Sequence, residues 1–127
     1  MNPILVMENW AKKLKPGAMV AGVVPDCRYT FDLRQQPSTI EEWKNEYAGN
    51  MNAIGYDKYE RWCKYTAPYN TPENLIERDY SIHVHYYTPD SYSKLIDILI
   101  EKGVYQSAFY NTSPNNKDFG FILQKTQ

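Results

Sequence analysis

The stretch LKPGAMVAGVVPDCRYTFDLR, Leu14–Arg34, determines the fold that we predict for this chain. Its Pro16–Gly17 turn leads into the apolar and small residues Met19–Val24, which are too few for a helix and show no alternation of apolar and polar side chains. Such a run is typical of a strand covered on both faces, as in the parallel core of an α/β sheet. We therefore predict a buried parallel strand that ends at Pro25.

Charged and aromatic side chains follow this predicted strand directly. Open α/β sheets bind ligands at the carboxyl ends of their strands, and a guanidinium there can donate two parallel hydrogen bonds to a carboxylate or phosphate. We predict that the substrate-binding residues are Asp26, Arg28, Tyr29, Asp32 and Arg34. The alternative is that the two aspartates pair with the two arginines and only hold the loop in place.

Length, charge and cysteine content restrict the class of protein. The 127 residues suffice for a single domain, 1–127, with its own core. A net charge of -1 offers no attraction to nucleic acid or to an anionic membrane, and no apolar run approaches the ~20 residues of a membrane-spanning helix. No signal-peptide pattern opens the chain, and Cys27 and Cys63 lack metal-ligand spacing. We expect a cytoplasmic protein with two free thiols.

Local signals predict the remaining elements. Asn2 with Pro3 can begin a helix, the capping boxes at Ser38 and Thr39 begin another, and Thr88-Pro89 begins the last. The predicted helices cover residues 2–14, 39–47, about 57–64 and 88–102, and the rest of 48–80 is irregular. Residues 81–87 can be extended. Val104–Asn111 and Phe119–Lys125 are predicted strands, joined through the turn TSPNNKD into an antiparallel hairpin.

His83 and His85 are the two histidines of the chain. At positions i and i+2 of an extended segment they would point to the same face. One of them could act as a general base that removes a proton from an acceptor oxygen. Both could instead bind a metal, although such a site needs three or four ligands, or both could be hydrogen-bonded structural imidazoles in a half-buried strand.

The order of these segments resembles the C-terminal half of class I S-adenosylmethionine-dependent methyltransferases. Many members carry a Leu-Lys-Pro-Gly-Gly turn before the fifth strand, and here it is LKPGA, with Ala18 in place of the second glycine. Members near this chain continue with a segment of the type VPDCRYTFDLR, then with a histidine-bearing segment before the last helix, here HVHYYTPDSY, and end in an antiparallel hairpin. The resemblance extends from Asn2 to Lys125.

This resemblance implies a three-layer α/β domain, a partial Rossmann-like methyltransferase fold whose mixed sheet ends in an antiparallel hairpin. It also implies methyl transfer from S-adenosylmethionine to a small-molecule acceptor, such as a sugar or another oxygen nucleophile. The acceptor would lie near Asp26–Arg34, and His83 and His85 would be the catalytic candidates.

The chain departs from the family where the methyl donor binds. Members hold the donor on a glycine-rich loop after the first strand, where a backbone without side chains lets the cofactor approach closely. None of the six glycines forms a G-x-G pair with another. We therefore expect a fragment, truncated or naturally a half-domain, that carries the acceptor side of the cleft and is inactive alone.

The same comparison predicts a homodimer. In the parent fold one neighbour of the strand Met19–Val24 would come from the missing half, so that edge would be open to another copy. Two alternatives to the methyltransferase fragment stay open: a non-catalytic module that works by pairing with another chain, and a metal-binding protein built on His83 and His85.

Overall fold

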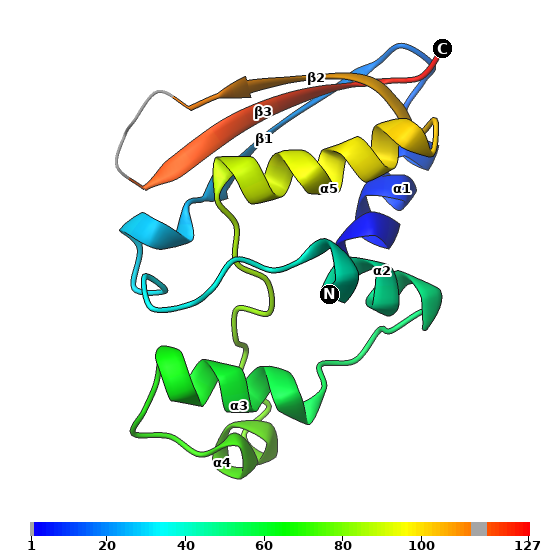
Figure 1. Cartoon of the computed structure of the whole chain (residues 1–127). Coiled ribbons are helices and arrows are strands. Elements are labelled where there is room, and N and C mark those ends of the chain that lie inside the picture. The colour runs from blue at the N-terminus through cyan, green and yellow to red at the C-terminus, as the bar shows by residue number, and fades with distance from the viewer. Residues whose placement is uncertain (1, 113–116) are drawn as a thin grey trace.

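The computed structural model describes residues 2–112 and 117–127. The order of its elements is α1 (Pro3–Lys13), β1 (Met19–Pro25), the short 3-10 helix η1 (Cys27–Tyr29), α2 (Ile40–Ala48), α3 (Tyr56–Tyr65), α4 (Pro72–Glu77), α5 (Pro89–Glu101), β2 (Tyr105–Asn111) and β3 (Asp118–Lys125). The protein is therefore mixed α/β. Figure 1 shows α1 and α5 beneath one face of the sheet, α2 below them, and α3 with α4 farthest from the strands.

The strands form a three-stranded sheet of order β1-β3-β2, in which both pairings are antiparallel. The last strand inserts between the other two, with Ala21 opposite Ile122 on one side and Phe109 opposite Ile122 on the other. This arrangement confirms the predicted closing hairpin. The hairpin's turn lies largely at residues 113–116, outside the described residues.

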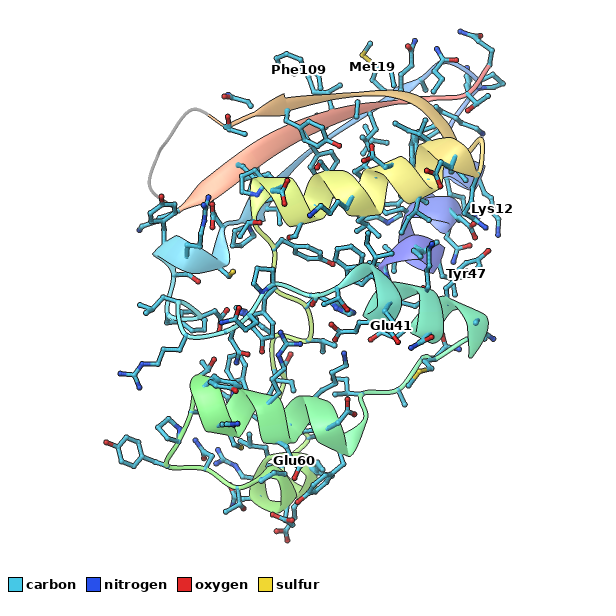
Figure 2. All side chains as sticks on the ribbon, in the orientation of Figure 1. Lys12, Met19, Glu41, Tyr47, Glu60 and Phe109 are labelled. Carbon is cyan, nitrogen blue, oxygen red and sulfur yellow. The ribbon has the colours of Figure 1, made fainter. Side chains whose placement is uncertain are left out.

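The strand β1 differs from the prediction in two respects. It pairs antiparallel with β3, and along its length exposed and half-buried residues alternate. Met19 and Val23 are 66% and 69% exposed, and Figure 2 shows Met19 on the sheet face that carries no helix. The expected strand covered on both faces, with a third layer, is therefore not what the described residues form, because helices pack against one face only.

Helix starts follow the predicted caps at Asn2, Thr39 and Thr88, whereas Ser38, also predicted to form a capping box, bonds His85 and Tyr86 instead. The side chain of Asn2 accepts a hydrogen bond from the N–H of Leu5, and Thr39 and Thr88 each complete a capping box. These bonds satisfy N–H groups that have no partner within the helix. Gly103, at φ 71°, follows the last turn of α5 in the left-handed region that glycine adopts without strain.

The region 48–87 contains one helix more than predicted. Thr71 caps α4, and Pro72 occupies its first turn, a start signal of the same kind as that of α5. Residues 81–87 form no regular strand, but Tyr87 makes a single parallel bridge with Asp26, directly after β1. This bridge places the histidine-bearing segment beside the loop that follows β1.

Two buried clusters hold these parts together. The larger joins α1, α2 and α5 to the inner face of the sheet, around Trp43, Leu99 and Leu123. The smaller joins η1, α3, α4 and the 82–86 segment around Trp62, Leu75 and Tyr86. Across residues 2–112 and 117–127, none of the helices has the length and apolar character needed to cross a bilayer.

Candidate functional site

A carboxylate–imidazole pair lies between the loop after β1 and the segment before α5. Oδ2 of Asp32 is 2.6 Å from Nδ1 of His83. Asp32 is 4% exposed, and its other oxygen, Oδ1, accepts a hydrogen bond from Oγ1 of Thr66 at 3.1 Å. Thr66 in turn accepts a hydrogen bond from Gln35. Both oxygens of the buried carboxylate are therefore held in place.

This geometry fixes the proton of His83. An ionised carboxylate can only accept hydrogen bonds, so Nδ1 of His83 carries the proton that is donated to Asp32. In the neutral ring, Nε2 is then the unprotonated nitrogen and can act as a base. The His83 side chain is 52% exposed, so the imidazole can be reached from solvent while its carboxylate partner cannot.

Aromatic rings flank the imidazole. The ring centre of Phe31 lies 5.2 Å from that of His83 at an interplanar angle of 31°, and that of Trp62 lies 5.4 Å away, edge to face. Trp62 is buried, whereas Phe31 is 65% exposed. An adjacent cavity of about 330 Å³ is lined by Asp32, His83 and His85 among others. This volume is at the small end of the range for small-molecule pockets.

His85 belongs to a second, buried network, which Arg61 links to the residues around Asp32 through Gln35. Its Nδ1 is 3.0 Å from Oγ of Ser38, and its Nε2 is 2.9 Å from Oε2 of Glu46. Ser38 also accepts a hydrogen bond from the backbone N–H of Tyr86. Both ring nitrogens of His85 are thus hydrogen-bonded, and the network ties the 85–86 segment to the start of α2.

The same network contains a group of potential metal ligands. Ligand atoms of Glu42, Glu46 and His85 lie within 4.8 Å of one another. However, the ammonium of Lys58 contacts both carboxylates, and it is 3.0 Å from Oε1 of Glu46. Arg61 contacts Glu42 as well, so two cationic side chains already pair with the two acids. His83 does not belong to this group.

Burial alone would raise the pKa of Glu42, but its hydrogen bond from Lys58 and the nearby positive charges outweigh that effect. The pKa of the Glu42 carboxyl therefore lies below its ordinary value.

The remaining predicted residues lie apart from the His83 pair. Asp26 is buried and receives two hydrogen bonds from the Arg28 side chain, at 2.9 and 2.6 Å. These bonds hold the pKa of Asp26 below its ordinary value. Arg28 stacks over the exposed ring of Tyr29, and Arg34 is exposed on the loop. For Asp26 and Arg28 the structure thus shows the loop-holding pair that was the alternative to substrate binding.

Sequence reasoning missed several residues of the site. Phe31 and Trp62 flank His83, Thr66 holds Asp32, and Glu46 holds His85. Phe31 lies within the loop Asp26–Arg34 that the sequence predicts to bind substrate, so its position in that loop could have identified it. The others come from α2 and from α3 with its C-cap residue, and no local pattern marks them as partners of a distant histidine.

Searches of protein-family models, curated proteins and solved structures find no match to this chain.

Proposed function

We propose that this chain supplies the acceptor side of a methyl transfer from S-adenosylmethionine to oxygen, with His83 as the general base. The observation that carries the proposal is the buried Asp32 carboxylate, 2.6 Å from Nδ1 of an accessible His83 at the edge of a cavity. A base oriented in this way suits the deprotonation of a hydroxyl group, which is a poor nucleophile until its proton is removed.

In this proposal the proton of the acceptor hydroxyl passes to Nε2 of His83 as the oxygen becomes nucleophilic. The imidazole then carries a positive charge, which the buried Asp32 carboxylate stabilises through Nδ1–H. General-base assistance of this kind is worth ~10²–10⁴ in rate. His85 keeps both ring nitrogens occupied and acts in the proposal as a positioning residue for the cavity wall.

The described residues lack the glycine-rich loop that is expected to hold the methyl donor. No two glycines form a G-x-G pair, and the two glycines with positive φ, Gly17 and Gly103, follow helices rather than preceding them. We therefore assign only binding of the acceptor to this chain, and we expect no methyl transfer by the chain alone.

Other features support the class of acceptor, the methyltransferase-like fold and the cytoplasmic location in this proposal. The exposed Phe31 ring beside His83 offers a flat apolar surface on which a sugar or an aromatic ring can lie. The parallel bridge of Tyr87 with Asp26 and the strand that inserts between β1 and β2 are compatible with part of a Rossmann-like methyltransferase sheet. Cys27 and Cys63 are buried free thiols, in keeping with a cytoplasmic setting.

Titration with hydroxyl compounds, followed by NMR, tests the proposal. A panel of sugars and phenols is compared with the corresponding O-methyl ethers, and the imidazole signals of His83 and the ring signals of Phe31 are recorded. We expect at least one free hydroxyl compound to shift these signals, its methyl ether to bind more weakly, and the variant His83→Ala to lose the discrimination. A folded protein whose His83 responds to no member of the panel would contradict the proposal.

A further inference from the structure

The strand β1 has an open edge. The N–H of Asp26 donates to the C=O of Lys117, and the C=O of Ala18 accepts from Lys125, so the even-numbered residues at both ends of β1 face β3. Backbone groups alternate in direction along a strand. The N–H and C=O groups of Met19, Ala21 and Val23 therefore point away from β3, toward the edge of the sheet.

Between Met19 and Val24 nothing on this edge discourages pairing with another strand, and the one proline of β1, Pro25, is its last residue. From Met19 to Val24 it carries no charge and no proline, the two devices by which natural edge strands commonly avoid association. The opposite edge of the sheet differs, because β2 has a register shift between Tyr105 and Ser107 and exposes polar side chains. Of the two edges, β1 is the one suited to association.

An apolar groove lies between α1 and the end of β1. Its volume is about 550 Å³, and its lining includes Val6 and Trp10 of α1, Val24 of β1 and Tyr87. Val6 and Trp10 are 38% and 48% exposed. Open backbone groups on the strand and exposed apolar side chains on the helix below it thus lie along one side of the molecule.

We propose that a second copy of this chain covers this side, with the two β1 strands pairing antiparallel about a two-fold axis at Ala21. This register places Ala21 opposite its own counterpart and Met19 opposite Val23, so that all the open backbone groups of these residues exchange hydrogen bonds. Every cross-strand pair is apolar, and no like charges meet. The result is a continuous six-stranded sheet.

The axis, perpendicular to the sheet, keeps the helices of both copies on the same face. The exposed side chains of α1, Val6 and Trp10, then approach their counterparts across the seam, and the two apolar grooves face each other. The interface is isologous, the commonest form of soluble dimer. It ends before Cys27, whose N–H is already bonded to Tyr87.

Light scattering across the micromolar range tests the dimer. The wild-type chain should have twice the 14.9 kDa of a single copy. Ala21→Pro removes an edge N–H that does not bond β3, and proline is tolerated at such positions of edge strands, so this variant should have the mass of one copy. The matched control Ala21→Thr keeps the N–H and should stay dimeric. Trp10→Lys should shift the equilibrium toward the monomer.

Hydrogen exchange provides a measurement that needs no variant. The amides of Met19, Ala21 and Val23 should be protected at high protein concentration and should lose that protection on dilution, whereas amides bonded to β3 should not change. A wild-type chain of single-copy mass at every concentration overturns the proposal. So does a dimer that persists in a folded Ala21→Pro variant, or one whose three edge amides exchange freely.

Discussion

At the scale of single residues, Asp32 determines what His83 can do. The imidazole is half exposed, and its orientation depends on a carboxylate that is buried and held from its other side by Thr66. This division of roles, with an accessible base and an inaccessible orienting acid, is how a histidine is kept in one tautomer. The Asp26 carboxylate is instead held by Arg28.

The substitution Asp32→Asn should reverse the tautomer of His83. Thr66 donates to one oxygen of the side chain, so the new amide would turn its NH₂ group toward Nδ1 and move the imidazole proton to Nε2. Nitrogen-15 chemical shifts of the imidazole report the two forms directly. Thr66→Val, which leaves the carboxylate intact, is the control and should keep the proton on Nδ1. An unchanged tautomer in Asp32→Asn would show that the carboxylate does not orient the ring.

At the scale of elements, Lys58 joins α3 to α2. Its side chain is 8% exposed and contacts Glu42 and Glu46, which are one turn apart on α2. Glu46 also accepts from His85, so the ammonium, the two carboxylates and the imidazole form one buried network. Removing one charge from such a network leaves the others without compensation, which costs more than the intact network contributes.

The substitution Lys58→Met should lower the free energy of unfolding by ~3–5 kcal/mol at neutral pH, because two carboxylates would lose their buried cation. Urea denaturation measures this loss. Lys64→Met, an exposed position of the same helix, should change stability by less than ~0.5 kcal/mol. A Lys58→Met protein as stable as the wild type would contradict the importance of the network.

The same pair of proteins should differ less in stability in acid than at neutral pH. The pKa of Glu42 is lowered in the folded state, so its contribution to stability is present above the ordinary value of 4.5 and is lost as the pH falls through the folded pKa. The difference between wild type and Lys58→Met should therefore shrink as the pH drops below about 4.5.

At the scale of the whole molecule, two separately packed regions meet at the candidate site. The sheet with α1, α2 and α5 forms one buried cluster, and α3 with α4 covers a second one beneath the 82–86 segment. His83 lies where the loop after β1, the end of α3 and that segment converge. Figure 1 shows α3 and α4 at the opposite end of the molecule from the sheet.

Calorimetric titration with S-adenosylmethionine tests the assignment of the chain to the acceptor side only. We expect no binding tighter than ~100 μM, which corresponds to about -5.5 kcal/mol, because no glycine pair provides the close backbone approach that the donor needs. The protein's thermal unfolding transition serves as the control that it is folded. Saturable binding with one site per chain would place the donor on this chain and overturn the assignment.

Elements with local signals could be predicted from the sequence. Asn2, Thr39 and Thr88 begin their helices as predicted, since a capping side chain bonds backbone groups only two or three residues away. The closing hairpin followed from two predicted strands joined by a local turn signal. Thr71 and Pro72 form an equally local start signal for α4, although the prediction treats the region around them as irregular.

How β1 is covered, and which groups surround the histidines, depends on long-range packing. An apolar run shows that a strand can be buried on both faces, but burial depends on what packs there, and here one face has no helix on it. Similarly, Asp32 and His83 are separated by 51 residues. Their contact arises because the Tyr87 bridge and the packing around Trp62 bring two loops together, which no local pattern encodes.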